Sequence, residues 1–392
     1  MGKVIMIIID GLGDRPIEEL GNKTPLEAAE TPNLDRLARN GICGLMEPVK
    51  GMACESDAGH LSIFGYDLEK YYCGRGPLEA LGLGFDLKEG DVAFRANFAT
   101  LDSSGKIIDR RAGRIESVSE LAQALDGKQI EDCTVYVIPG IRHRSAVVIR
   151  GSNLGSNVTD TDCELGERPK KCYPEGEESK KTAEIANKFM EFAESALKNH
   201  PINKGRVQSS LLPANCLLLR GAGRYKRPVS FQEKYGLNAC AITEGGLYGG
   251  IGKFLSMGSI IVEGVNDKFD TNLEAQFNAA LEALQKYDFV FVHVKPTDVF
   301  GHDGKFIEKT KFIERLDTHL DVLHNLDTLI VITADHSTPC KLKDHSADPV
   351  PILLHGKGVS SSGIKKFSEK ECCTGFRIQG KDVMPMIMKL LG

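Results

Sequence analysis

The sequence lacks the features that mark membrane-spanning and nucleic-acid-binding proteins. No apolar run approaches the roughly eighteen residues that a membrane-spanning helix needs. Lysine and arginine together number 49 against 54 aspartate and glutamate residues, so the net charge of -5 gives no basic excess. We therefore expect neither a membrane nor a nucleic acid as a partner. The sequence also shows no targeting signal, which predicts a cytoplasmic location.

Cysteine motifs and repeats are also absent. None of the eleven cysteines forms a pair at the two-residue gap of a zinc or redox motif, and Cys372 and Cys373 are adjacent. We interpret all of them as reduced thiols. No internal repeat or low-complexity tract appears. With 392 residues, 41% hydrophobic and 26% charged, the composition is that of a globular protein long enough for about two domains.

Several apolar runs end directly in carboxylates or imidazoles. Val4–Ile9 is followed by Asp10, and Thr328–Thr333 leads to Asp335 and His336. Unalternating, β-branched runs of this kind predict strands of a parallel sheet that is covered on both faces. Ligands of such sheets collect outside the carboxyl ends of the strands.

A third apolar run, Asp288–Val294, leads into a segment that carries Asp298 and His302. His345 lies in the loop before a further predicted strand, Val350–Leu354. Strands and helices therefore alternate at both ends of the chain, which predicts an α/β fold.

The polar residues at these strand ends form one candidate set: Asp10, Asp298, His302, Asp335, His336 and His345. Carboxylates and imidazoles without thiolates suit Mn²⁺, Zn²⁺ or Mg²⁺ rather than copper or an iron–sulfur cluster. Six ligands are enough for two ions, which can clamp the attacking and leaving oxygens in phosphoryl transfer.

Ser56 adds a hydroxyl to this set. It stands where a helix is predicted to begin, beside free backbone N–H groups that favour an anion such as phosphate. Coordination to a metal ion would activate it as a nucleophile. Between about Asp91 and Leu237 the chain changes to shorter strands with many arginines near their ends, as expected where phosphate or carboxylate is held.

Each residue also has a plain structural interpretation. Asp10 alone can cap a helix or form a turn, and Ser56 alone can be an N-cap. His60 could be a ligand, a proton carrier or a histidine on a helix face, and the last is the default interpretation. We treat His293 as structural or solvent-facing. A single arginine is usually solvated. The functional hypothesis therefore depends on the joint occurrence of ligands at successive strand ends.

The motifs themselves resemble a known family. They are Asp10–Pro16, Lys23–Ala29, Thr31–Asp35, Ser56–Leu61, Gly74–Pro77, Phe94–Thr100, Asp109–Arg114, His293–Asp298, Thr333–His336 and His345–Pro351. Together they are similar to those of the archaeal-type cofactor-independent phosphoglycerate mutases, which belong to the alkaline phosphatase superfamily. The resemblance spans nearly the whole chain.

This resemblance implies an enzyme that interconverts 3-phosphoglycerate and 2-phosphoglycerate through a phosphoserine on Ser56, without 2,3-bisphosphoglycerate. It implies an alkaline-phosphatase-like core with a mostly parallel sheet flanked by helices, formed by residues 1–78 and 238–392, and a smaller inserted α+β domain, 79–237, that binds substrate as a lid. One metal ion would be held by Asp298, His302 and His345. The other would be held by Asp10, Ser56, Asp335 and His336. Mn²⁺ is the favoured ion, with Mg²⁺, Zn²⁺ and Co²⁺ as alternatives.

Candidate substrate-binding residues are Arg111, Arg114, Arg144, Arg220 and Lys253. Two positions depart from the family pattern. Cys73 replaces a common threonine, and the Pro-His that usually follows Asp162 is missing, which puts the role of Asp162 in doubt.

Two alternatives stay open at this stage. One is a metal-dependent phosphomonoesterase, or a phosphomutase for another phosphorylated metabolite, and the other is a silent binding protein on the same fold. The physiological metal and the oligomeric state are also undecided.

Overall fold

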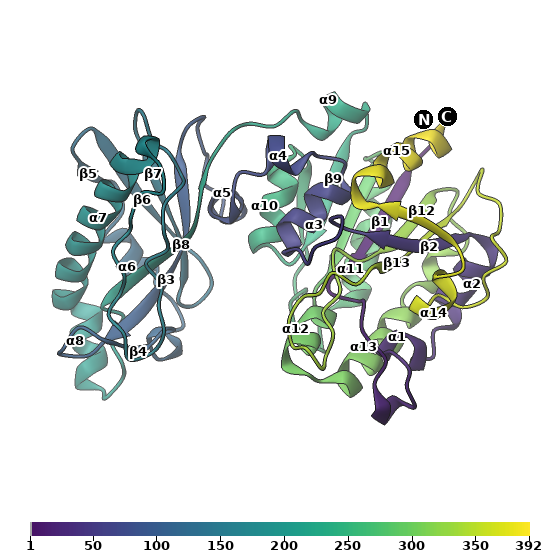
Figure 1. Cartoon of the computed structure of the whole chain (residues 1–392), viewed down its shortest axis with the longest axis horizontal. Coiled ribbons are helices and arrows are strands. Elements are labelled where there is room, and N and C mark those ends of the chain that lie inside the picture. Colours follow the sequence, from purple (N-terminus) through teal and green to yellow (C-terminus); the bar gives the residue numbers. More distant parts are fainter. Residues whose placement is uncertain (1) are drawn as a thin grey trace. The chain divides into compact units, whose positions relative to one another are not determined.

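The computed structural model describes residues 2–392 and divides the chain into two compact units (Figure 1). The first unit comprises the chain up to Tyr72, Val229–Glu244 and Ile251–Gly392, and the second comprises Cys73–Pro228 and Gly245–Gly250. The division near Tyr72 lies before the predicted boundary at residue 78, because helix α5 (Arg75–Gly82) packs against strands of the second unit.

The first unit is built on an eight-stranded sheet with the order β10-β9-β11-β1-β12-β13-β2-β14. Its strands are β1 (Val4–Ile9), β2 (Ile42–Glu47), β9 (Ala239–Thr243), β10 (Gly258–Ile261), β11 (Phe289–Val294), β12 (Leu329–Thr333), β13 (Val350–His355) and β14 (Phe376–Gln379). Neighbouring strands are parallel except where β13 runs against β12 and β2. The sheet is therefore mostly parallel, as predicted.

The centre of this sheet is β1, which lies between β11 and β12. Residue Val4 pairs with Phe289 on one side and with Leu329 on the other. All residues of β1, β11 and β12 are buried, so both faces of the sheet are covered. The three apolar runs of the sequence are thus the three central strands, and their carboxyl ends meet at one edge.

Helices and short turns connect these strands. They are α1 (Pro25–Ala28), α2 (Pro32–Asn40), α3 (Ser56–Ile63), α4 (Leu68–Tyr71), α9 (Phe231–Tyr235), α10 (Gly246–Phe254), α11 (Leu273–Ala283), α12 (Pro296–Asp303), α13 (Phe306–Thr318), α14 (Glu369–Cys372), α15 (Gly380–Leu391) and the 3-10 turns at Glu18–Leu20 and Asp321–Leu323. Helix α3 packs against α15, and α13 packs against α1, α2 and α12.

The second unit has a sheet with the order β4-β3-β7-β6-β5, in which β8 also pairs with β3. Its strands are β3 (Val92–Leu101), β4 (Ile107–Asp109), β5 (Lys128–Ile130), β6 (Cys133–Pro139), β7 (Arg144–Arg150) and β8 (Cys216–Arg224), and all pairs are antiparallel. Its helices are α5, α6 (Ser119–Gln123), α7 (Lys180–Asn199) and α8 (Pro201–Gln208), with 3-10 turns at Ala112–Arg114 and Glu177–Ser179.

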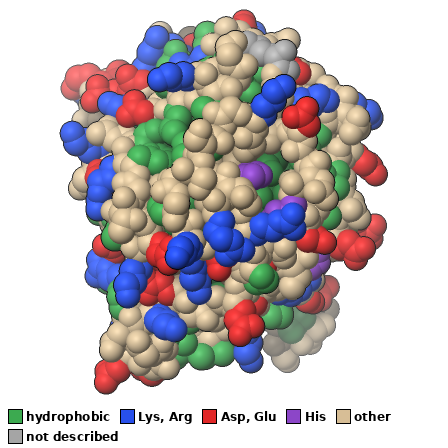
Figure 2. Space-filling view, turned by 90° about the vertical axis from the view of Figure 1, so that its right-hand side faces the viewer, with side chains coloured by type: hydrophobic (Ala, Val, Ile, Leu, Met, Phe, Trp, Pro, Cys, Tyr) green, Lys and Arg blue, Asp and Glu red, His purple; other side chains and the backbone are tan. Residues whose placement is uncertain are grey.

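The core of the second unit lies between this sheet and α7. Phe94 and Phe98 of β3 share one cluster with Phe189 and Leu197 of α7. Two units with these sheets confirm the α/β class, with a smaller α+β part beside a mostly parallel sheet. None of the helices among residues 2–392 is both long and apolar enough to cross a membrane. Figure 2 shows one face of the molecule, on which acidic and basic side chains are interspersed.

A partly buried acid in the first unit makes its stability depend on pH. The carboxylate of Glu369, the first residue of α14, accepts hydrogen bonds from Thr24 Oγ1 (2.7 Å) and from the backbone N–H of Asp14 (3.3 Å). Burial raises the pKa of Glu369 from 4.5 to about 7. Above pH 4.5 the unfolded chain therefore loses a proton that the folded chain keeps, so stability falls as the pH rises towards 7.

The variant Glu369→Gln should remove this dependence. We expect the free energy of unfolding of the unmodified protein to fall by about 3 kcal/mol between pH 4.5 and 8 because of this one group, and the fall to be smaller in the variant by that amount. Urea denaturation at several pH values measures the difference. Glu308→Gln, at an exposed position of α13, serves as the control and should leave the pH profile unchanged. Parallel profiles for all three proteins would contradict the assignment to Glu369.

Candidate metal centre

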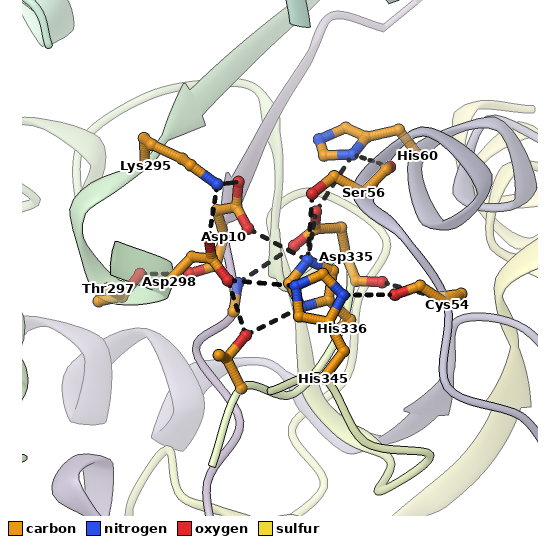
Figure 3. Close-up of polar contacts among 12 residues, drawn as sticks. Asp10, Cys54, Ser56, His60, Lys295, Thr297, Asp298, Asp335, His336 and His345 are labelled. Carbon is orange, nitrogen blue, oxygen red and sulfur yellow. Dashed lines mark hydrogen bonds and ion pairs between the residues drawn. The ribbon is translucent and has the colours of Figure 1, made fainter. Parts of the chain in front are cut away.

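The predicted ligands come together at the carboxyl edge of the central strands (Figure 3). Asp10 follows β1, and Asp335 and His336 follow β12. Asp298 and His302 follow β11 on helix α12, which was not predicted from the sequence. Pro296 at the first position fits a helix start. The spacing of four residues then places Asp298 and His302 on the same side of α12.

The first cluster is Asp10, Asp335 and His336, all of them buried. His336 Nε2 lies 3.3 Å from Asp10 Oδ1 and 3.3 Å from Asp335 Oδ2. The other oxygen of Asp335, Oδ1, accepts a hydrogen bond from the backbone N–H of Gly11 (3.2 Å). Asp335 Oδ2 is buried but accepts no hydrogen bond in the described structure. A cation at this position would satisfy it.

The second cluster is Asp298, His336 and His345, with His302 beside it. Asp298 Oδ1 lies 3.4 Å from His302 Nε2 and 3.5 Å from His345 Nε2. The two Nε2 atoms of His302 and His345 are 3.1 Å apart. The rings of His336 and His345 are stacked with centroids 3.8 Å apart, so His336 is within reach of both clusters.

All three imidazoles point the same nitrogen into the clusters. The Nδ1 atoms of His302 and His345 lie 3.1 Å from Lys343 O and 3.0 Å from Cys54 O, and Nδ1 of His336 lies 3.1 Å from Thr338 Oγ1. A carbonyl oxygen accepts only an N–H donor, so Nδ1 of His302 and His345 carries the proton and Nε2 offers a lone pair. Carboxylate oxygens facing lone-pair nitrogens are a donor set that fits divalent cations.

The two central carboxylates have opposite pKa shifts. Burial and the neighbouring Asp10 raise the pKa of Asp335 well above its usual range. Burial also acts to raise the pKa of Asp10, but Lys295 and His293 hold it well below its usual range. A second negative charge beside Asp10 is therefore unfavourable in the protein alone, and a bound cation would stabilise it.

Ser56 is the first residue of helix α3, as predicted, and its Oγ lies 3.1 Å from His336 Nε2. The serine is buried. His60, one turn further along α3, lies with Nδ1 2.7 Å from Ser56 O and 3.4 Å from Asp335 Oδ2. The helix therefore brings the hydroxyl of Ser56 and the buried ring of His60 to the first cluster.

Two histidines treated as structural, and one lysine, turn out to belong to this site. His60 contacts Asp335, and Nε2 of His293 lies 3.1 Å from Asp10 Oδ2 while its Nδ1 lies 2.9 Å from Glu244 Oε2. For His293, the sequence did offer a signal, because it is a histidine inside the otherwise apolar strand β11. Lys295 was missed: its Nζ lies 2.9 Å from Asp10 Oδ2 and 2.6 Å from Asp298 Oδ2. Figure 3 shows it reaching both carboxylates.

Three arginines project from one face of the sheet in the second unit. Arg95 of β3 pairs with Arg220 of β8, and Asn97, two residues along β3, pairs with Arg144 of β7. Paired residues and residues two apart share a face of a sheet. Burial and neighbouring arginines lower the pKa of Arg95 to about 10, although Glu79 lies 3.1 Å from its Nε.

The remaining candidate substrate-binding residues, and Asp162, lie outside this set of three arginines. Burial and the charges of Arg144, Arg111 and Arg220 lower the pKa of His143 to about 4, so all three arginines lie within electrostatic range of His143. Asp162 forms ion pairs with Arg110 and, at 3.8 Å, with Arg220. Arg114 is an exposed residue of the turn Ala112–Arg114, and Lys253 is exposed in the last turn of α10. Their roles in substrate binding stay predictions.

The central strands of a parallel sheet end here in two adjoining carboxylate–imidazole clusters, and a buried serine at a helix start lies beside them. These features define the class of enzymes with a candidate two-metal centre suited to phosphoryl transfer.

Comparisons with known proteins identify the family within this class. Residues 38–203 match the family model described as 2,3-bisphosphoglycerate-independent phosphoglycerate mutase. A protein of that description from Archaeoglobus fulgidus is 47% identical over 403 residues, which covers 99% of this chain and 98% of the relative.

Solved structures agree with the sequence relatives. The structure of the PH0037 protein from Pyrococcus horikoshii has a TM-score of 0.87 at 38% identity, covering 100% of this chain and 97% of that one. The cofactor-independent phosphoglycerate mutase from Thermoplasma acidophilum has a TM-score of 0.76 at 36% identity, with full coverage of both chains. The chain belongs to the 2,3-bisphosphoglycerate-independent phosphoglycerate mutases, a family of isomerases, and the predicted family is confirmed.

Proposed function

We propose that this enzyme interconverts 3-phosphoglycerate and 2-phosphoglycerate through a phosphoserine at Ser56, at a site that holds two divalent metal ions and needs no 2,3-bisphosphoglycerate. The observation that carries the proposal is the position of Ser56 Oγ, 3.1 Å from the Nε2 of a histidine that both clusters share. An enzyme with this activity would take part in glycolysis and gluconeogenesis. The predicted cytoplasmic location would agree with such a role.

The chemistry has two transfers that mirror each other. In the first, Ser56 Oγ forms a bond to phosphorus as the bond from phosphorus to O3 of the substrate breaks, and the proton lost by the serine ends on O3 of glycerate. In the second, O2 of the same glycerate takes the phosphoryl group back, and its proton returns to Ser56. No water enters either transfer, so access of water to phosphoserine must be restricted.

The ligand assignment follows the clusters. Asp298, His302 and His345 would hold one ion, and Asp10, Ser56, Asp335 and His336 the other, with Mn²⁺ favoured over Mg²⁺, Zn²⁺ and Co²⁺. Bound there, the ions would supply positive charge for the phosphoryl oxygens and lower the pKa of the serine hydroxyl. Gly59 of α3 lets the helix approach the site, because an added Cβ would lie 2.4 Å from Asp335 O.

The substrate's remaining charges need cationic partners. We assign this role to the arginine face of residues Arg95, Arg144 and Arg220, and to Arg111, because planar guanidinium groups grip carboxylate and phosphate with two hydrogen bonds. The second unit would then act as the substrate-binding lid, as the sequence predicts.

Removal of metal should abolish activity. We expect protein treated with a chelator to form no 2-phosphoglycerate from 3-phosphoglycerate, and re-added Mn²⁺ to restore the reaction in the absence of 2,3-bisphosphoglycerate. Phosphorus-31 NMR follows both isomers and free phosphate in one sample. Formation of free phosphate without 2-phosphoglycerate would show that the enzyme is a phosphomonoesterase and not a mutase. Inactivity with each of Mn²⁺, Mg²⁺, Zn²⁺ and Co²⁺ would overturn the proposal as a whole.

A further inference from the structure

The hydroxyl of Thr338 lies where the two clusters meet. Thr338 is fully buried in the segment that follows β12. Its Oγ1 lies 2.8 Å from Asp298 Oδ1 and 3.1 Å from His336 Nδ1. Asp298 is a member of one cluster, and His336 is within reach of both. One side chain outside the predicted ligand set therefore contacts candidate ligands of both ions.

The direction of these two hydrogen bonds follows from the atoms. A hydroxyl has one hydrogen, and an ionised carboxylate can only accept, so the O–H of Thr338 donates to Asp298. The oxygen of Thr338 is then the acceptor for the N–H at Nδ1 of His336. That leaves the lone pair on Nε2, the atom that lies 3.3 Å from Asp10 Oδ1. Thr338 thereby fixes which nitrogen of His336 is available to a metal ion.

The backbone of Thr338 is held in place on both sides. Its N–H donates to Gly13 O (3.0 Å), and its carbonyl oxygen accepts from the buried ammonium of Lys309 (3.0 Å). The space around it is filled, since a Cβ added at Gly11 would lie 2.5 Å from Thr338 Oγ1 and one at Gly301 would lie 2.5 Å from Thr338 O. The backbone that carries this hydroxyl is therefore fixed by hydrogen bonds and by close packing.

We infer that Thr338 is a positioning residue that links the two metal sites, by setting the tautomer of His336 and the orientation of Asp298 through one hydroxyl. This inference rests on the proposed two-metal function. Loss of the hydroxyl should weaken the binding of metal, because the partners of metal ligands typically contribute about 10- to 100-fold in metal affinity.

Mn²⁺ titration of chelator-treated protein by isothermal calorimetry tests this. We expect Thr338→Val, which keeps the shape and removes the hydroxyl, to bind Mn²⁺ about 10- to 100-fold more weakly than the unmodified protein. Thr338→Ser should restore most of the affinity. The matched control is Thr333→Val, because Thr333 is also fully buried and donates its hydroxyl to Pro351 O (3.0 Å) away from the clusters.

A second measurement needs neither metal nor activity. In metal-free protein labelled with ¹⁵N-histidine, NMR should show His336 protonated at Nδ1, and Thr338→Val or Thr338→Ala should move the proton towards Nε2. Unmodified protein that binds no Mn²⁺ would overturn the two-metal function itself. The role of Thr338 alone would be overturned by a different result. In that case the unmodified protein binds two ions, and the Thr338 variants keep both its Mn²⁺ affinity and its His336 tautomer.

Discussion

Replacing Ser56 by alanine is expected to lower mutase activity at least about a thousandfold, because the variant lacks the only atom proposed to carry the phosphoryl group between the two transfers. The loss should appear in kcat, and no phosphorylated form of the protein should accumulate with 3-phosphoglycerate. Mass spectrometry of the peptide containing residue 56 checks the phosphoserine directly, and a coupled assay checks the rate.

The chain offers a matched control for this experiment. Ser62 is another buried serine of α3, and it lies on the part of the helix that faces Gly380 of α15. Ser62→Ala should keep both the activity and the phosphorylated peptide. Mutase activity that survives in Ser56→Ala would remove the serine from the proposed chemistry and leave the family assignment intact.

Replacing Lys309 by methionine should have the largest effect on stability. Lys309 Nζ is fully buried and lies 2.9 Å from Asp14 Oδ2, whose side chain is 1% exposed. Without the ammonium, the carboxylate of Asp14 stays buried without its counter-charge, and breaking such a pair costs about 3–5 kcal/mol. Because the sequence has no tryptophan, circular dichroism in urea is the suitable probe of unfolding.

Two further variants separate charge from packing. Lys305→Met breaks an exposed pair with Asp303 (2.8 Å) just before the same helix and should change stability by less than about 1 kcal/mol. Combining Lys309→Met with Asp14→Asn removes the unpaired charge and should recover a large part of the loss. Equal losses in the single and double variants would show that packing of the lysine side chain, and not the ion pair, stabilises this region.

Much of the metal centre could be predicted because its ligands follow strands with a strong signal. The runs before Asp10 and Asp335 are apolar except for Thr333, which left little choice but central strands of a parallel sheet. Parallel neighbours end at the same edge, so Asp10, Asp335 and His336 could be placed together without coordinates. Asp298 was also found, although its helix was not.

The rest of the site could not be predicted, for physical reasons that differ. Lys295 is a long side chain at a strand end, and only the pairing of β11 with β1 directs its ammonium to Asp10 and Asp298. Thr338 stands in an irregular segment with no periodicity, so nothing in the sequence separates its hydroxyl from that of Thr333. The alignment of Arg95 with Arg220 depends on an antiparallel register that loops of the second unit determine.

The place of β1 at the centre of the first sheet has a consequence for biosynthesis. β1 is made before the other strands of its sheet, yet both of its neighbours, β11 and β12, lie beyond residue 288. Through most of translation this apolar segment therefore has no native strand to pair with, whereas all six strands of the second unit are complete once residue 224 has been made. The nascent chain must carry an unpaired hydrophobic strand for most of its synthesis, so we expect its yield to depend on chaperones that shield the amino-terminal segment.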